Sequence, residues 1–89
     1  MAEQITRDLT VTWITSRIEF TNNTNDMERF FMQMSDSEKY YIDLNKEHLA
    51  SEMAAISLIK DAFLHDRKLN LFWESRDGRR WLKAVNLHG

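Results

Sequence analysis

A chain of 89 residues is long enough for one domain with its own hydrophobic core. Hydrophobic residues make up 43% of it and charged residues 29%, proportions of a globular protein that exclude an intrinsically disordered chain. The absence of cysteine excludes disulfides and all zinc, iron–sulfur and redox sites built on thiolates.

The net charge of −2 predicts no non-specific binding to nucleic acid or to an anionic membrane, but the charge is unevenly distributed. Residues 67–83 contain six basic and two acidic residues, a local charge of +4, whereas the rest of the chain carries −6. This division favours head-to-tail contact between copies of the chain, or an anionic ligand at the basic end. A solvated hairpin with scattered arginines would show the same pattern.

No apolar run approaches the roughly 20 residues that span a bilayer, so we expect no membrane insertion. No leader with a charged and then an apolar region precedes the first predicted strand. A cytosolic chain and a mature secreted product both fit, because a chain without cysteine is compatible with either redox environment.

The first predicted strand covers residues 9–20 and is bent. Leu9, Val11 and Trp13 alternate with polar residues, and after Trp13 the apolar series shifts by one position to Ile14 and Ile18. A β-bulge causes such a shift and bends a strand, so that it can serve two sheets. Residues 1–8 are expected to be a flexible polar lead-in, and residues 9–89 to form a single domain.

Two further strands are predicted before the spacing of the apolar residues changes from a period of two to a period of 3.6. Phe30, Met32 and Met34 predict a strand over residues 29–34, and Tyr40 and Ile42 predict one over residues 40–44. Residues 35–39, with the sequence SDSEK, predict the turn that joins them.

From residue 45 to about residue 66 the apolar period is 3.6, which predicts a helix. Ile56, Ile59 and Phe63 share the face that we expect to be buried. Met53 and Leu64 fall outside this face, so the helix has more apolar surface than one core contact needs. That surplus favours a second buried face in an oligomer, although exposed apolar residues on a helix margin are also common.

The C-terminal part predicts a β-hairpin with strands over residues 69–74 and 81–87, because Asp77-Gly78 is a strong hairpin signal. The order β-β-β-α-β-β describes a mainly β protein with one helix, a five-stranded Greek-key OB-like barrel whose helix closes one end. A four-stranded α+β sheet packed against the helix is the alternative. The predicted core consists of Phe30, Met32, Ile42, Ile56, Ile59, Phe63, Leu69 and Leu71.

Residues 53–73, MAAISLIKDAFLHDRKLNLFW, resemble the passage from the helix to the fourth strand in the OB-fold B subunits of bacterial A–B toxins of the cholera and subtilase type. In that family a similar helix ends in Ala-aromatic-Leu or a close variant, followed by a short basic turn and a strand rich in Val and Leu. The similarity is best over residues 49–87. The resemblance implies a homo-oligomeric ring, usually a pentamer, with helices around a central pore and paired edge strands. It also implies glycan binding without catalysis.

Two features differ from the toxin pattern. The cholera-type subunit has a disulfide between its N-terminal region and its fourth strand, whereas this chain has neither cysteine nor a leader. A ring-forming relative without a toxin role therefore fits equally well. By position, Trp73 stands where the cholera-type subunit has its sugar-stacking tryptophan, but Glu74 and Ser75 replace the amide residues that follow it. The sugar specificity would then differ or be lost.

The predicted ligand site is the hairpin segment 73–80, which supplies an indole, a carboxylate, a hydroxyl and arginines for a neutral or sialylated sugar. A structural cross-strand pair of Trp73 and Trp81 is the competing interpretation. The predicted ligand-binding residues are Trp73, Glu74, Ser75, Arg76 and Arg80.

The sequence contains no motif of a hydrolase nucleophile or a phosphate-binding loop, and its three histidines are not spaced as metal ligands. We therefore expect no enzyme, no catalytic residues, no metal site and no cofactor.

Two alternatives to glycan binding stay open. The second and third strands offer Arg29, Phe31, Gln33 and Tyr41 for single-stranded nucleic acid, as in other OB folds. Against this, residues 22–44 contain two basic and five acidic residues, which repel phosphates. A structural ring, or a docking platform for a catalytic or other partner chain, is the third possibility.

Overall fold

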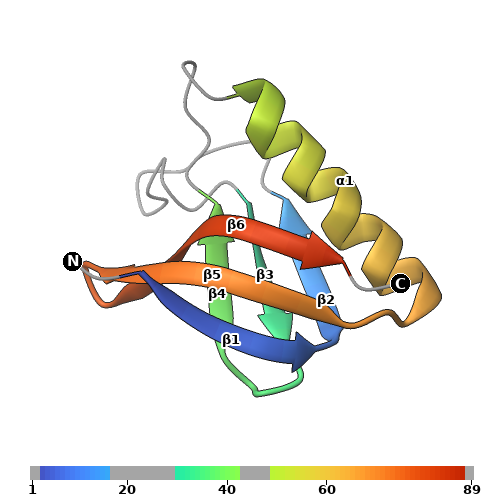
Figure 1. Cartoon of the computed structure of the whole chain (residues 1–89), viewed down its shortest axis with the longest axis horizontal. Helices are drawn as coiled ribbons and strands as arrows, with labels where there is room; N and C mark the ends of the chain where they lie inside the picture. The colour runs from blue at the N-terminus through green and yellow to red at the C-terminus, as the bar shows by residue number, and fades with distance from the viewer. Residues whose placement is uncertain (1–2, 17–29, 43–48, 88–89) are drawn as a thin grey trace.

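The computed structural model describes residues 3–16, 30–42 and 49–87. This part of the chain forms six strands and one helix (Figure 1). In chain order they are β1 (Gln4–Leu9), β2 (Val11–Ser16), β3 (Phe30–Met34), β4 (Lys39–Ile42), α1 (Leu49–His65), β5 (Leu69–Arg76) and β6 (Arg79–Leu87). Residues 45–48 of the predicted helix and residues 17–20 of the predicted first strand lie outside the described residues.

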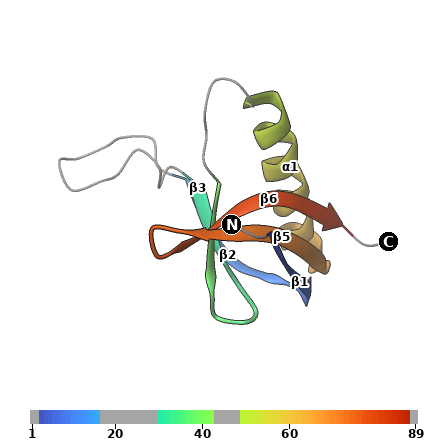
Figure 2. The same cartoon turned by 60° about the vertical axis from the view of Figure 1, so that its left-hand side comes forward.

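The six strands form one sheet in the order β1-β5-β6-β4-β3-β2. All neighbouring strands are antiparallel except β4 and β6, which are parallel. Because β1 and β2 lie at opposite ends of this order but follow each other directly along the chain, the sheet curls into an OB-like barrel. The helix packs against β6 and β2, on one side of the barrel (Figures 1 and 2). The predicted fold class is confirmed.

The strand count is six, and not five as predicted, because residues of the predicted lead-in form β1, which Thr10 separates from β2. Asp8 has a left-handed backbone with φ of 59°, and its N–H group donates to Oδ1 of Asn70 at 3.0 Å. Thr10 and Ser35 exchange two hydrogen bonds, of 2.8 and 3.1 Å. The register of β2 against β3 also shifts between Val11 and Trp13, directly before the predicted change of parity, and one stretch of chain pairs with both β5 and β3.

The flexible lead-in predicted for residues 1–8 is wrong, since the ordered strand begins at Gln4. Five of the six residues of β1 are not buried. They are held by main-chain pairing with β5 rather than by an apolar face, so the sequence carries no alternating signal there.

Six of the eight predicted core residues are buried, and Ile56 is partly buried against the core. Phe63 is the exception, with 44% of its surface exposed. The helix turns Ile59 and Ala62 completely inward. Because the small side chain of Ala62 lets the helix approach the sheet on that side of Ile59, Phe63 on the other side is rotated outward.

The apolar surface outside the core is larger than predicted. Met53, Phe63 and Leu64 are 54, 44 and 72% exposed. Since 11 residues are about three helical turns, Met53 and Leu64 lie on the same side of α1. No helix in the described residues is both long and apolar enough to cross a membrane.

The chain turns on either side of β5 through residues with positive φ, and the Asp77-Gly78 turn has the backbone that its sequence predicts. Asp66 has φ of 52° after the last helical residue, and the N–H group of Arg67 donates to the carbonyl of Ala62 at 2.9 Å, which closes the helix end. Asp77 and Gly78 both have positive φ, of 54 and 74°, as a two-residue hairpin turn requires.

Ile59→Ala tests the orientation of the helix. We expect it to lower the free energy of unfolding by about 2–5 kcal/mol, because it opens a cavity at a fully buried position. Ser57→Ala, at an exposed position of the same helix, should change it by no more than about 0.5 kcal/mol. Urea denaturation measures both, and a loss below about 0.5 kcal/mol for Ile59→Ala would contradict this packing.

Candidate ligand-binding site

The Asp77-Gly78 turn determines which residues face one another in the β5–β6 hairpin. It pairs Trp73 with Leu82 and Glu74 with Trp81. Since neighbouring residues of a strand point to opposite faces, Trp73 and Trp81 lie on opposite faces of the sheet. The competing interpretation of a cross-strand tryptophan pair is therefore wrong.

The same register divides the five predicted ligand-binding residues between two faces. Ser75 and Arg80 are paired and belong to the face of Trp73. Glu74 and Arg76 belong to the opposite face, together with Trp81. The structure therefore does not bring the five residues into one site.

Trp73 belongs to the interior of the barrel. Its exposed fraction is 9%, and its Nε1 donates to Oγ1 of Thr6 at 2.9 Å. The guanidinium of Arg80 lies over the indole, 4.5 Å from the ring centroid. Stacking of a sugar on Trp73 would require Arg80 to leave this ring.

Arg80 joins the hairpin to the β3–β4 turn. It donates to the hydroxyl of Tyr40 at 3.1 Å, and it forms ion pairs with Asp36 at 3.9 Å and Glu38 at 3.7 Å. The Tyr40 hydroxyl in turn donates to Oδ2 of Asp36 at 2.8 Å. Burial raises the pKa of Tyr40 above its ordinary value of 10.0. This cluster supports the parallel β4–β6 contact that closes the barrel.

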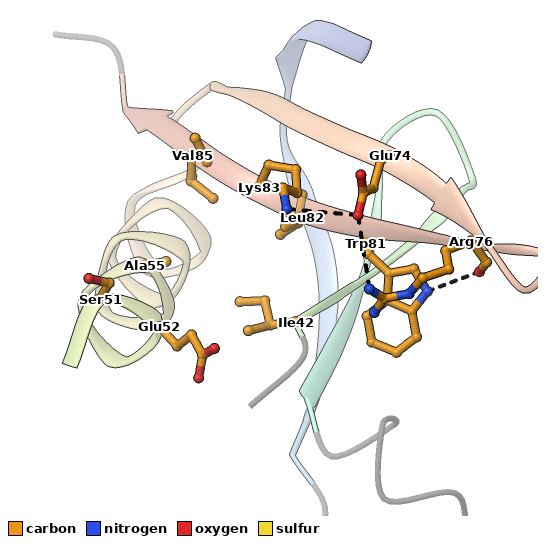
Figure 3. Close-up of a pocket in the computed structure, with 11 residues that line it drawn as sticks. Ile42, Ser51, Glu52, Ala55, Glu74, Arg76, Trp81, Leu82, Lys83 and Val85 are labelled. Atoms are coloured by element: carbon orange, nitrogen blue, oxygen red, sulfur yellow. Dashed lines mark hydrogen bonds and ion pairs between the residues drawn. The ribbon is translucent and has the colours of Figure 1, made fainter. Parts of the chain in front are cut away.

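Glu74, Arg76 and Trp81, from the other face of the hairpin, contribute to a cleft of about 440 Å³ between α1 and β6. Oε1 of Glu74 lies 3.9 Å from Arg76 and 3.7 Å from the amine of Lys83 (Figure 3). The guanidinium of Arg76 lies over the ring of Trp81 at 4.7 Å, and Nε1 of Trp81 donates to the Arg76 carbonyl at 3.0 Å. The helix contributes Ser51, Glu52 and Ala55, and the strands also contribute Ile42, Leu82, Ala84 and Val85.

Lys83 faces this cleft because of a bulge in β6. Trp73 pairs with Leu82 and Phe72 with Ala84, so Lys83 has no partner on β5. A bulge re-aims a side chain in this way, here toward Glu74.

The polar groups of the cleft suit an uncharged polar ligand. Two carboxylates, from Glu52 and Glu74, balance the two cations of Arg76 and Lys83. Carboxylates accept hydrogen bonds from hydroxyl groups, and the cations and the Ser51 hydroxyl can donate them.

Sequence reasoning found only Glu74 and Arg76 of this set. Counting outward from Asp77-Gly78 would have placed Trp81 beside Glu74. Lys83 gave no such signal because the sequence does not mark the bulge. The helix residues Ser51 and Glu52 join the cleft only through tertiary packing.

Four aromatic rings continue from the cleft across the sheet. Trp81 contacts Tyr41 at 5.5 Å between ring centroids, Tyr41 stacks on Phe31 at 5.1 Å, and Phe31 meets Trp13 edge-on at 5.6 Å. We call these four residues the aromatic row. Nε1 of Trp13 also donates to Oε1 of Gln33.

Of the three histidines, only His65 is among the described residues, where it is exposed and 3.6 Å from Asp61. Within residues 3–16, 30–42 and 49–87, no three acidic, histidine or cysteine side chains gather as metal ligands would.

By sequence, the chain matches no protein-family model and no curated protein. Its fold matches eight chains of solved structures. One of these is a porcine heat-labile enterotoxin variant in complex with an inhibitor, with a TM-score of 0.76 over 98% of this chain and 86% of that chain. The identity is 10%, so the likeness shows the fold alone. It supports the toxin B-subunit fold that the resemblance implied.

The buried Tyr40 hydroxyl predicts a loss of stability at alkaline pH. Because burial raises its pKa, the folded protein holds this proton more tightly than the unfolded chain does. The resulting stabilisation is complete below the ordinary pKa of 10.0 and is lost as the pH rises through the folded-state pKa. Urea unfolding between about pH 9 and pH 11.5 should therefore show wild type losing stability relative to Tyr40→Phe, by at most about 1.4 kcal/mol per pH unit. Parallel curves for the two proteins would contradict this.

Proposed function

We propose that the chain is a non-enzymatic binding module, a subunit of a homo-oligomeric ring, most simply a pentamer, that binds a glycan in the α1–β6 cleft. The observation that carries this proposal is the composition of the cleft, in which two carboxylates, two cations and a hydroxyl surround a volume of about 440 Å³. The solved enterotoxin of the same fold is bound to an inhibitor, which agrees with ligand binding by such a barrel.

The groups of the cleft match the chemistry of a sugar. Glu52 and Glu74 can accept hydrogen bonds from hydroxyl groups, and Lys83 and Ser51 can donate to them. The apolar side chain of Val85 offers a surface for the C–H face of a pyranose. Since the lining charges balance, a neutral sugar unit fits better than a charged one. A single shallow site of this kind binds weakly, at about −4 kcal/mol in the millimolar range.

The exposed side of α1 supports assembly into a ring. Met53, Phe63 and Leu64 present apolar surface on one side of the helix, and burying such a side chain fully contributes about 1.5–3 kcal/mol. Several weak sites on one ring raise the avidity by about 10² or more without new contacts. Assembly therefore gives so small a chain a useful affinity.

Single-stranded nucleic acid is the second candidate, and the aromatic row favours it, because bases stack on aromatic side chains. However, Phe31 and Trp81 are only 7 and 2% exposed. Bases require accessible ring faces, so we retain the glycan as the ligand.

Glu74→Gln tests the cleft. Glycan-array screening identifies the saccharide, and calorimetric titration should then show affinity reduced about tenfold, since a hydrogen bond to a charged group contributes about 1.5–3 kcal/mol. Glu3→Gln is the matched control, because Glu3 is exposed and does not line the cleft. Trp73→Phe removes the bond to Thr6 and should lower stability without abolishing binding.

Loss of glycan binding in folded Trp73→Phe would indicate that the glycan binds on the opposite face of the hairpin, where Trp73 lies. The absence of any glycan signal, together with single-stranded DNA binding that weakens steeply with salt, would support nucleic acid instead.

Light scattering at micromolar concentration tests the ring. We expect a mass about five times the 10.7 kDa of one chain. Leu64→Glu should dissociate the oligomer, because it places a charge in the apolar contact, whereas Ala54→Glu on another side of α1 should leave it assembled. A wild-type species of 10.7 kDa would contradict the assembly.

A further inference from the structure

The side of β1 that faces away from β5 has no paired strand among the described residues. β1 is the first strand of the sheet order, and residues 3–7 precede the bend that leads into β2 (Figure 1). The N–H and C=O groups on the open side of such a strand can pair with another chain. We call residues 3–7, on the side away from β5, the β1 edge.

The outward side chains of the β1 edge carry opposite charges at its two ends. Thr6 accepts the N–H of Trp73 and therefore points into the barrel. By strand alternation Ile5 and Arg7 point outward, and Glu3 continues this series. All three are exposed, and Ile5, at 46%, is the one exposed large apolar side chain of the described strands. Among the described residues, neither Glu3 nor Arg7 has an opposite charge within 4.0 Å.

This arrangement is self-complementary. If two β1 edges run antiparallel with Ile5 opposite Ile5, Glu3 of each copy lies opposite Arg7 of the other. Opposite charges directly across paired strands stabilise the pairing, and like charges destabilise it. Moving the two-fold axis by one position, to Gln4 or to Thr6, sets Ile5 opposite a charged side chain and loses both ion pairs. The side chains therefore favour one register.

The β1 edge is separate from the apolar side of α1. The helix packs against β6 and β2, whereas β1 lies at the end of the sheet order opposite β2. Met53, Phe63 and Leu64, which support the proposed ring, all belong to the helix. A contact through β1 therefore uses a different surface and does not depend on the proposed function.

We propose that the β1 edge is an interface between two copies of this chain, which pair antiparallel about a two-fold axis through Ile5. The contact is isologous, since each copy contributes the same residues. It joins two barrels through one continuous sheet, with Ile5 against Ile5 at the centre and an ion pair of Glu3 with Arg7 on each side. One short strand covers less area than a standard interface, so we expect a weak contact with a Kd of about 0.1–1 mM.

Sedimentation equilibrium of Leu64→Glu tests the pairing without the ring, because this variant lacks the apolar contact of α1. As the chain concentration is raised to about 1 mM, we expect the mass to rise from 10.7 kDa toward twice that value. Adding Ile5→Ser should weaken the pairing about tenfold, because it removes the central apolar contact. In a mixture of isotope-labelled and unlabelled chains, NOEs should connect the Ile5 methyl groups of two copies.

Charge reversal in the same Leu64→Glu background tests the register. Arg7→Glu sets carboxylates opposite each other at both ends of the contact, and Glu3→Arg sets guanidinium groups opposite each other. Each should weaken self-pairing about tenfold. A mixture of the two variants should associate as tightly as the parent, since every Glu then faces an Arg. Lys68→Glu, the same reversal at an exposed position outside β1, should leave the pairing unchanged.

A mass of 10.7 kDa at every concentration would overturn the interface. A mixture that associates no better than its two separate components would also overturn it, because β1 would then pair with a different strand, such as β2 of the second copy. Equal weakening in Lys68→Glu would indicate general charge repulsion and contradict the register. None of these results affects the cleft or the ring, which Glu74→Gln and the mass of the wild type test separately.

Discussion

One short stretch of chain, residues 8–10, must leave its pairing with β5 and begin pairing with β3, and the barrel depends on this. Asp8 adopts a left-handed backbone there, and its N–H group is satisfied by the side chain of Asn70, a buried polar residue in the strand next door. Without that acceptor the bend would leave a partly buried donor unpaired, which costs about 1–3 kcal/mol. The bend closes the sheet, and closure brings β4 beside β6. The α1–β6 cleft depends on that contact, since it includes residues of β4 and β6.

The fold was predictable because its main signals are local. Alternation marked β3 and β5, a period of 3.6 marked the helix, and Asp77-Gly78 marked the hairpin. The sequence patterns did not predict the structure correctly where the stabilising contacts do not depend on the alternation of apolar and polar side chains. Main-chain pairing forms β1 from polar residues. Phe63 was expected inside because it shares a helical face with Ile59, but Ala62 decides on which side the helix approaches the sheet. The period of the apolar residues identifies the apolar face of the helix. It does not fix the rotation of that face relative to the sheet to within one residue.

The site was less predictable because it depends on register and on neighbours. Trp73 occupies the position of a sugar-stacking tryptophan in the resembling family, yet position along a strand does not determine exposure. Here Arg80 covers the indole, and Thr6 accepts its N–H. Only Glu74 and Arg76 of the predicted set face the cleft, because a two-residue turn places them on the face opposite Trp73. Counting residues outward from the two-residue turn would have predicted from the sequence which residues lie on each face of the hairpin. The bulge that directs Lys83 to Glu74 could not have been found in this way, since it adds one residue without a distinctive residue type.

The charged residues likewise have different neighbours along the chain and in the folded structure. Residues 67–83 carry +4 along the chain, but Glu74 lies close to both Arg76 and Lys83, and Arg80 is paired with carboxylates of the β3–β4 turn. Those carboxylates, Asp36 and Glu38, are also part of the acidic excess of residues 22–44 that argued against an anionic ligand. The single positive charge of Arg80 offsets one of these two negative charges. The basic hairpin and the acidic β3–β4 turn therefore compensate each other in part, where β4 lies beside β6.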